Sequence, residues 1–249
     1  MATPRFFVEA RLEVGEDFEL SEDQTRQIRR VLRARVGDSI AVFDGSGAEG
    51  QATITDLDGT QAGYRIDVVS RPKREPQLEI TVGLALIKGD RFELGLQKLT
   101  EVGVRSIVPI VADRSVVAWQ DQDVWERRSA RLNRIIVEAA EQSERVTLPD
   151  LHSPVPLESF LQSHEVIAMV ERLNARPLTS IEVGDHVALA IGPEGGWSER
   201  ERELINDSAA ATATLGSLIM RAETAAIVAA GAVAQRWLEQ SGTVPCEEP

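Results

Sequence analysis

The pattern of apolar positions changes once along the chain, near residues 70–77. Beyond this segment, short runs rich in valine, isoleucine, leucine and alanine alternate with stretches whose apolar residues recur at helical spacing. The apolar runs are LEITVGLALI, SIVPIV, EVIAMV, VALAI and ATATL, and the helical stretches lie near 90–103, 123–145, 199–208 and 222–240. This alternation predicts an α/β domain with a mostly parallel sheet and helices on both faces.

The pattern before this segment is different. Ser21 and Gln24 have the spacing of a capping box, which predicts a helix to about Arg35. Two β-branched runs, SIAVFD and QATITDL, flank a glycine-rich turn and predict a pair of strands. Prolines and basic residues in SRPKREPQ mark the boundary. We therefore expect a small β-rich domain with one helix at 1–73 and an α/β domain at 74–249.

The charge is distributed unevenly. The chain has 249 residues, 43% of them hydrophobic, which is enough for a sizeable core, and a net charge of −13. Residues 1–74 carry 11 basic and 13 acidic side chains, whereas residues 75–249 carry 16 and 27. Five arginines fall within ten residues of the first part, with no acid among them: Arg26, Arg29, Arg30, Arg33 and Arg35. Charge alone leaves two interpretations open, a solvated helix face and a surface that binds nucleic acid.

Other features argue against several classes of protein. No stretch resembles a signal peptide, and the longest apolar run, Ala225 to Ala234, is too short to span a bilayer. We therefore expect a cytoplasmic protein with no membrane partner. Cys246 is the only cysteine, which excludes an intrachain disulfide. The histidines stand singly without metal-ligand spacing, so no metal is expected: His152, His164 and His186.

One glycine motif resembles a nucleotide-binding sequence but has the wrong context. Gly45, Gly47 and Gly50 match GxGxxG, yet a β-branched run follows them where a dinucleotide site needs a helix. We therefore expect a hairpin turn. The sequence contains no GxxxxGK[ST], HExxH or GxSxG motif, which argues against the common NTPases, zinc proteases and serine hydrolases.

Two segments near the C-terminus carry most of the chemical information. IGPEGGWSERE and LGSLIMRAETAA each read as a strand end, a loop with glycines and a helix start, where α/β sheets bind ligands. Ser198 and Glu201 form a capping box, and the second loop contains an apolar run, 218–220. The loop could close over a flat apolar group such as adenine, with Arg221 and Glu223 at the mouth. A purely structural strand-to-helix turn is the alternative, and the residues alone predict no more than a small-molecule pocket.

The same segments resemble a known family. GPEGGWS and LGSLIMRAETA are similar to the cofactor-binding signature of SPOUT-class RNA methyltransferases, specifically the ribosomal RNA small subunit methyltransferase E family. Four other segments occur in that family's order: RFFV, RRVLRARVGDSIAVFDGSG, ALIKGDRFELGLQKLTEVGV and VEAAEQSER. The resemblance implies an N-terminal PUA-like β-barrel that binds RNA, a C-terminal SPOUT domain with a trefoil knot, and a homodimer with the site at its interface.

The resemblance also implies a reaction and a set of residues. The reaction is methyl transfer from S-adenosyl-L-methionine to N3 of uridine 1498 in 16S rRNA of the small ribosomal subunit. As catalytic residues we hypothesise Arg221, which would stabilise negative charge on the base, and Glu223, which would position Arg221 or relay the proton. The alternative is that both residues only cap the loop and the helix. The cofactor would contact Met169, Val170, Glu171, Ile191, Gly192, Pro193, Glu194, Gly195, Gly196, Leu215, Gly216, Leu218, Ile219, Met220, Thr224 and Ala225. The RNA would contact Arg5, Arg30, Arg33, Lys88, Arg91, Glu138 and Gln142.

Three positions depart from the family pattern. Gln27 replaces a common histidine, Leu218 a usual arginine and Met220 a usual leucine. The loss of a cation at Leu218 is expected to weaken RNA or subunit contact, whereas the change at Met220 conserves volume. Two alternatives therefore stay open, a SPOUT enzyme that methylates another RNA position and a non-catalytic rRNA-binding protein.

Overall fold

The computed structural model describes residues 3–115, 119, 121–171 and 175–242. The chain divides into two compact units, the first formed by Met1–Glu75 with Ala140–Leu148 and the second by Pro76–Ala139 with Pro149–Pro249. The domain boundary expected between residues 73 and 74 stays a prediction, because the first unit also includes a segment far along the sequence.

The first unit contains a five-stranded sheet with the order β1-β3-β4-β5-β2. β1 pairs in parallel with β3, and all other neighbours in this sheet are antiparallel. The glycine-rich segment after β3 is a hairpin turn into β4, which confirms the expectation from the sequence. The strands are β1 (Arg5–Phe7), β2 (Asp17–Glu19), β3 (Ser39–Phe43), β4 (Glu49–Asp56) and β5 (Gly63–Ser70).

The helix of this unit is shorter than expected. Helix α1 (Glu22–Gln27) begins at the capping box of Ser21 and Gln24 and continues as a π-helical turn over Ile28–Leu32. Arg33 follows in the left-handed conformation, with φ of 52°, and the Ala34 amide donates to the Ile28 carbonyl. The helix therefore ends before Arg35, because the wide π turn brings the chain out of the helical path at Arg33.

The second unit is built on an eight-stranded sheet in which all pairings are parallel, as the apolar runs predict. Its order is β11-β13-β10-β12-β6-β7-β8, and β9 also pairs with β7. All four residues of β10 are buried, as a strand covered on both faces requires. The strands are β6 (Glu79–Ala85), β7 (Ser106–Val111), β8 (Asp150–Leu151), β9 (Val155–Pro156), β10 (Val166–Met169), β11 (Arg176–Pro177), β12 (His186–Ile191) and β13 (Ala211–Thr214).

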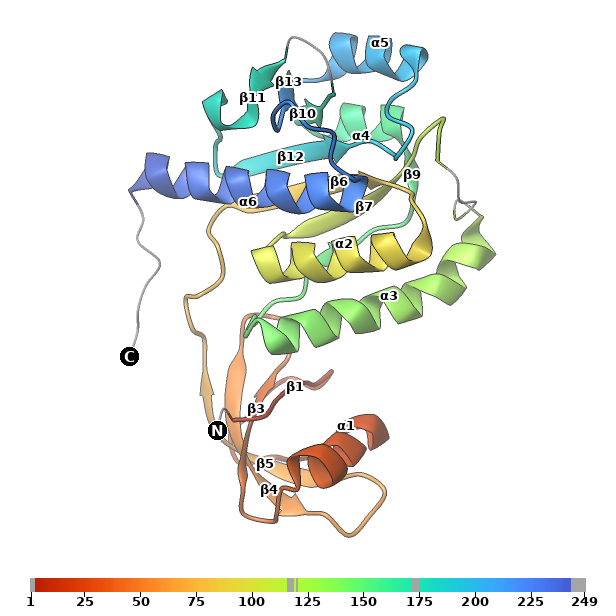
Figure 1. The fold of residues 1–249 in the computed structure, drawn as a ribbon. Coiled ribbons are helices and arrows are strands. Elements are labelled where there is room, and N and C mark those ends of the chain that lie inside the picture. Colours follow the sequence, from red (N-terminus) through yellow and green to blue (C-terminus); the bar gives the residue numbers. More distant parts are fainter. Residues whose placement is uncertain (1–2, 116–118, 120, 172–174, 243–249) are drawn as a thin grey trace. The chain divides into compact units, whose positions relative to one another are not determined.

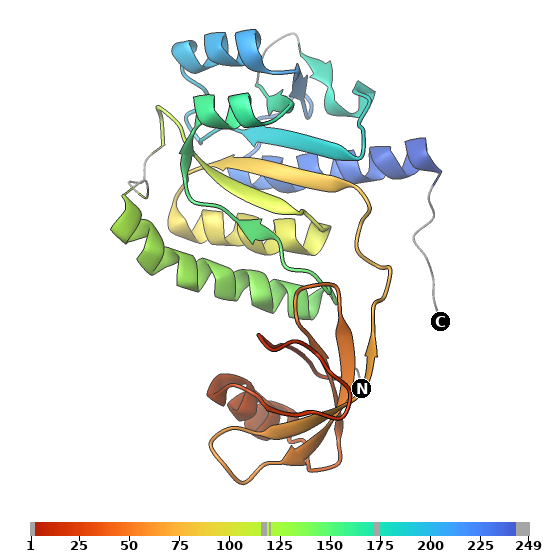
Figure 2. The same ribbon diagram turned by 180° about the vertical axis from the view of Figure 1, so that it is seen from behind.

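Helices cover both faces of this sheet. Helices α2 and α6 lie together on one face, with α3 beside α2 (Figure 1), whereas α4 and α5 lie on the other face (Figure 2). The short helix α4 was not expected from the sequence, and the knot stays a prediction. The helices are α2 (Gly89–Val102), α3 (Gln122–Gln142), α4 (Leu157–Ser163), the 3-10 turn η2 (Leu178–Ser180), α5 (Glu199–Ser208) and α6 (Ala222–Ser241).

Candidate functional site

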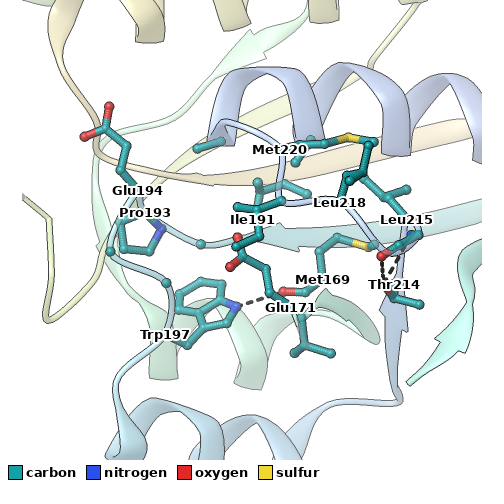
Figure 3. A pocket seen from close by; sticks show the side chains of 18 of the residues that line it. Met169, Glu171, Ile191, Pro193, Glu194, Trp197, Thr214, Leu215, Leu218 and Met220 are labelled. Carbon is teal, nitrogen blue, oxygen red and sulfur yellow. Dashed lines mark hydrogen bonds between the residues drawn. The ribbon is translucent and has the colours of Figure 1, made fainter. Parts of the chain in front are cut away.

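A pocket of about 650 Å³ lies at the carboxyl ends of three adjacent strands, β13, β10 and β12 (Figure 3). These strands end at Thr214, Met169 and Ile191, and each of these residues lines the pocket. Neighbouring parallel strands bring their carboxyl ends to one edge of a sheet, where α/β proteins bind ligands. The volume is in the range of small-molecule sites.

The pocket brings together the two segments that the sequence singled out. Thr224 is the one residue of the expected cofactor set that does not line it. The others all do: Met169, Val170, Glu171, Ile191, Gly192, Pro193, Glu194, Gly195, Gly196, Leu215, Gly216, Leu218, Ile219, Met220 and Ala225. Ser217, within the loop 215–220 that was expected to contact the cofactor, also lines it, as do four residues that the sequence analysis missed: Trp197, Arg202, Thr214 and Ala222. The binding role of the expected residues stays a prediction, although their proximity is a structural fact.

The buried Trp197 ties two of the pocket walls together. Its indole N–H donates to the Met169 carbonyl at 3.0 Å (Figure 3), which links the loop after β12 to the end of β10. A Cβ at Gly192 would lie 3.0 Å from the Trp197 ring, so glycine is needed for this close approach. Trp197 directly precedes Ser198, the N-cap residue of α5, and Arg202 lies at the end of the first turn of this helix. Trp197 belongs to the segment IGPEGGWSERE that the sequence analysis singled out, whereas Arg202 carries no local signal, because a hydrophobic staple needs an apolar residue at its position.

The loop after β12 is also anchored by cations from other elements. Arg91 in the first turn of α2 forms an ion pair with Glu194, and the Arg114 guanidinium donates to the Gly195 carbonyl at 2.7 Å. Gly196 has a φ of 67°, as a glycine turn requires, whereas Gly195 does not have a positive φ. Gly195 instead permits a close approach to Arg114, whose Cβ would be 3.3 Å from an added Cβ.

Asp113, just beyond β7, connects this loop to the start of α5. Its carboxylate accepts hydrogen bonds from the Ser198 hydroxyl at 2.6 Å and from Arg200, and its amide donates to the buried Glu201 carboxylate at 2.8 Å. The hydrogen bonds from Arg200 and then Ser198 lower the pKa of Asp113 below its usual value. Ser198 and Glu201 form the expected capping box. The network fixes the strand-to-helix turn that forms one wall of the pocket.

The loop after β13 forms the opposite wall. The Thr214 hydroxyl accepts from the Gly216 amide at 3.3 Å and donates to its carbonyl at 3.1 Å, which closes a tight turn at the strand end. The apolar side chains that follow are exposed, 81% for Leu218 and 53% for Ile219. Large exposed aliphatic side chains of this kind indicate a surface that covers a ligand or a protein partner.

Helix α6 begins directly after this loop and carries the expected catalytic residues. Arg221 is the exposed N-cap residue and makes no side-chain capping bond. Glu223 is 3% exposed, and its Oε2 atom has no hydrogen-bond partner in the described part of the chain. Thr224 is exposed on the same turn. Neither Arg221 nor Glu223 lines the pocket, although Met220 and Ala222 beside them do.

The arginines expected to bind RNA in the first unit differ in their surroundings. Arg30 and Arg33 are exposed, and Val31 between them is 73% exposed. Arg5 is instead largely buried, pairs with Glu49, donates to the Arg145 carbonyl at 2.6 Å and lies over the Phe43 ring. Burial, followed by the repulsion of Arg74, lowers the pKa of Arg5 to about 10. Its contacts thus stabilise the unit itself, and an RNA contact by Arg5 stays a prediction.

The other residues of the expected RNA set lie on α2 and α3. Lys88 is the N-cap residue of α2, and Arg91 follows in its first turn. Glu138 and Gln142 are exposed near the end of α3. The neighbouring Glu141 accepts a hydrogen bond from the Phe7 amide within the first unit.

The described residues include no group of three or more histidine, cysteine, aspartate or glutamate side chains arranged to hold a metal ion. Among the same residues, no helix is both long and apolar enough to cross a membrane. Cys246 lies outside the described residues.

Comparisons with known proteins agree with this architecture. The RNA methyltransferase domain family matches residues 73–234, and the RNA methyltransferase PUA domain family matches residues 20–62. These matches confirm the RNA methyltransferase character of the α/β domain and the PUA-like character of the N-terminal one.

Relatives from several bacteria carry one family name. The ribosomal RNA small subunit methyltransferase E of Synechocystis sp. is 33% identical over 84% of this chain and 70% of its own. That of Bacillus subtilis is 29% identical over 92% of this chain and 95% of its own.

Two solved structures of relatives contain a bound cofactor. The ribosomal RNA small subunit methyltransferase E of Neisseria gonorrhoeae, bound to S-adenosylmethionine, has a TM-score of 0.85 and 31% identity over 94% of this chain and 98% of its own. A Legionella pneumophila protein described as a methyltransferase with bound S-adenosylmethionine has a TM-score of 0.88 and 30% identity over the same shares. With its two domains, its pocket at three strand ends and these relatives, the chain belongs to the ribosomal RNA small subunit methyltransferase E family.

Proposed function

We propose that this protein transfers a methyl group from S-adenosylmethionine to N3 of uridine 1498 in the 16S rRNA of the small ribosomal subunit. The observation that carries the proposal is the pocket at the ends of β10, β12 and β13, in a chain whose solved relatives bind S-adenosylmethionine. We assign the protein to the cytoplasm, where ribosomal RNA is assembled into subunits.

The pocket has the size and chemistry to hold the cofactor. The apolar loop 218–220 suits a flat adenine ring, whose edge the backbone of the loop can hydrogen-bond. The lack of a side chain at Gly192 lets the Trp197 ring pack closely against the backbone of this wall, and Glu171 supplies an acidic group on the wall formed by β10. When bound, S-adenosylmethionine would supply an electrophilic methyl group on a cationic sulfur.

The protein contributes alignment and charge to the reaction. Methylation at N3 of uracil requires loss of the N3 proton, and the negative charge that develops spreads to the neighbouring carbonyl oxygens. Arg221 is exposed at the start of α6 and has no ion-pair partner among the described residues, so its guanidinium is available to stabilise this charge. Glu223 is buried in the first turn of the helix, which favours a positioning role for it over a direct proton relay.

A homodimer completes this proposal. Four exposed aliphatic side chains occur on the loop after β13 and on the helices α2 and α6: Leu218, Ile219, Leu94 and Val228. Apolar side chains concentrated on neighbouring elements suit an interface with a second copy of the chain.

Sedimentation velocity measurements on the wild-type protein and on a Leu94→Glu, Val228→Glu variant test the proposed dimer. A dimer that dissociates only in the variant supports the assignment, and a wild-type monomer contradicts it.

The function is tested by methyl transfer from labelled S-adenosylmethionine to small subunits that lack native modification, with mass spectrometry of the product. Label on N3 of uridine 1498 is the expected result. Label at another nucleotide would mean that the protein is an RNA methyltransferase with a different target, because methyl transfer would still require the cofactor pocket. Absence of label together with absence of cofactor binding would favour a non-catalytic rRNA-binding protein.

The role of Arg221 is tested by replacing it with glutamine. Loss of one charge-stabilising donor is expected to lower kcat by about 100-fold, with the Kd of S-adenosylmethionine unchanged. Arg221→Lys keeps the charge but loses the planar donor pair, so an intermediate kcat is expected. Wild-type methyl transfer and RNA binding by both variants would contradict the electrostatic role.

A further inference from the structure

Three of the described residues that line the pocket are ionisable: Glu171, Glu194 and Arg202. The ion pair with Arg91 already compensates Glu194. Arg202 was not expected from the sequence, and the proposed reaction leaves it without a role. A cation that lines a ligand pocket points to an anionic group on the ligand.

The contacts of Arg202 hold one end of its guanidinium and leave the other available. It lies in the first turn of α5 and is exposed, and its Nε–H donates to the Trp197 carbonyl at 3.1 Å. Its Nη groups make no hydrogen bond, and its side chain no ion pair, with the described residues. A guanidinium fixed through Nε retains the paired donors with which arginine binds a carboxylate.

The two ends of the pocket differ in chemistry, and the difference fixes which end of a ligand meets Arg202. Figure 3 shows Leu215, Leu218 and Met220 on one side and Trp197 on the other, and the hydrogen bond from Arg202 to Trp197 assigns Arg202 to the second side. S-adenosylmethionine has the same asymmetry, with adenine at one end and an amino acid at the other. Adenine at the apolar loop directs the amino acid toward Trp197 and α5.

We propose that Arg202 binds the α-carboxylate of the methionyl part of S-adenosylmethionine, and that it thereby selects ligands with an amino-acid end. The inference rests on the proposed use of S-adenosylmethionine. Because the Trp197 carbonyl orients the guanidinium and the Trp197 indole holds the end of β10, the same residue links carboxylate recognition to the shape of the pocket.

The experiment compares two ligands that differ only in this carboxylate, S-adenosylmethionine and its decarboxylated form. Isothermal titration calorimetry gives the Kd of each for the wild-type protein and for Arg202→Gln. The wild-type protein is expected to bind S-adenosylmethionine about tenfold more tightly than the decarboxylated form, as a charge-assisted hydrogen bond at a partly exposed site would give. Arg202→Gln is expected to bind both with the weaker Kd, because the cycle isolates the pairing of the guanidinium with the carboxylate.

Two further variants serve as controls. Arg127→Gln removes a charge from an exposed position of α3 that does not line the pocket, and it should leave both Kd values unchanged. Arg202→Lys keeps the charge without the paired donors and should retain part of the preference. Circular dichroism establishes that each variant is folded.

Several outcomes would overturn the inference. An equal loss of affinity for both ligands in Arg202→Gln would mean that Arg202 acts through the packing of Trp197. Unchanged ligand binding combined with weaker binding of small subunits would assign the guanidinium to RNA. If the wild-type protein binds neither ligand, the proposed function fails as well, and the wild-type titration alone reveals that failure.

Discussion

Two glycine-rich turns of this protein have similar sequences and different surroundings. The turn at 45–50 joins the antiparallel strands β3 and β4, and its Gly47 amide donates to the Val146 carbonyl within the same unit. The loop at 192–196 leaves the parallel strand β12, lines the pocket and leads into α5.

The difference teaches that the direction of the next element determines what a glycine loop can do. A hairpin returns at once to pair with its own strand, so its backbone groups are used within the sheet. A loop between a parallel strand and a helix opens at the carboxyl edge of the sheet, beside the loops of the neighbouring strands. The segment from Gly45 to Gly50 therefore matches GxGxxG but forms a hairpin turn and no nucleotide site. The segment GPEGG, in contrast, lines a pocket.

The largest effect on cofactor binding is expected from a side chain introduced at Gly192, in the loop that lines the pocket. Gly192→Val is expected to push the Trp197 ring away, since even a Cβ would lie 3.0 Å from it. Overpacking of this kind is expected to raise the Kd of S-adenosylmethionine roughly 30-fold, or about 2 kcal/mol. Gly184→Val is the matched control, because a Cβ at Gly184 meets no atom within 4 Å. An unchanged Kd in Gly192→Val, measured by calorimetry, would mean that the ligand does not depend on this wall.

A substitution in the hairpin turn should lower the stability of the protein and leave its affinity for the cofactor unchanged. Gly47 has a φ of 96°, so Gly47→Ala forces a side chain into the left-handed region and is expected to cost about 1 to 2 kcal/mol of unfolding free energy. The Kd of S-adenosylmethionine should not change. Urea unfolding and calorimetry on the same samples measure both quantities, and a loss of cofactor affinity would show that the hairpin contributes to the site.

Removing the indole N–H of Trp197 tests whether the tie between the pocket walls matters for the ligand. Trp197→Phe keeps a ring against Gly192 but leaves the Met169 carbonyl without its donor, at an expected cost of about 1 kcal/mol in stability and a several-fold rise in the Kd. Trp237→Phe removes an indole N–H that donates to Asp185 and does not line the pocket. A similar rise in the Kd of S-adenosylmethionine in Trp237→Phe would mean that the hydrogen bond of Trp197 has no specific effect on the pocket.

The smallest effect is expected at Asp113, which supports the loop from outside. Its pKa is lowered by the hydrogen bonds from Arg200 and Ser198, so its contribution to stability is present above the ordinary pKa and is lost as pH falls through the lowered one. Because the carboxylate is more than one-third exposed, Asp113→Asn is expected to cost less than about 1 kcal/mol at pH 7. The difference from wild type should shrink in denaturant titrations as the pH falls through the lowered pKa, and a difference that grows on acidification would contradict the sign.

The sequence predicted the secondary structure of the second unit well, because its strands are buried on both faces and its helices have clear start signals. Ser198 and Glu201 mark the start of α5, and the apolar run VALAI falls within the buried part of β12. Short elements such as β8, β9, β11 and α4 carry too few residues for a periodic pattern and were missed. The end of α1 was misjudged, because a π turn at Ile28–Leu32 depends on local packing.

The sequence by itself determined which segments carry the chemistry, because glycine loops after apolar runs and a capping box are local signals. The tertiary structure alone decided that Trp197 holds Met169, that Arg202 lines the pocket, and that Glu223 is buried while Arg221 is exposed. It also committed Arg5, which the sequence suggested for RNA, to a buried ion pair with Glu49. The physical reason is that strand order brings together residues far apart along the chain, and burial and pairing depend on those neighbours.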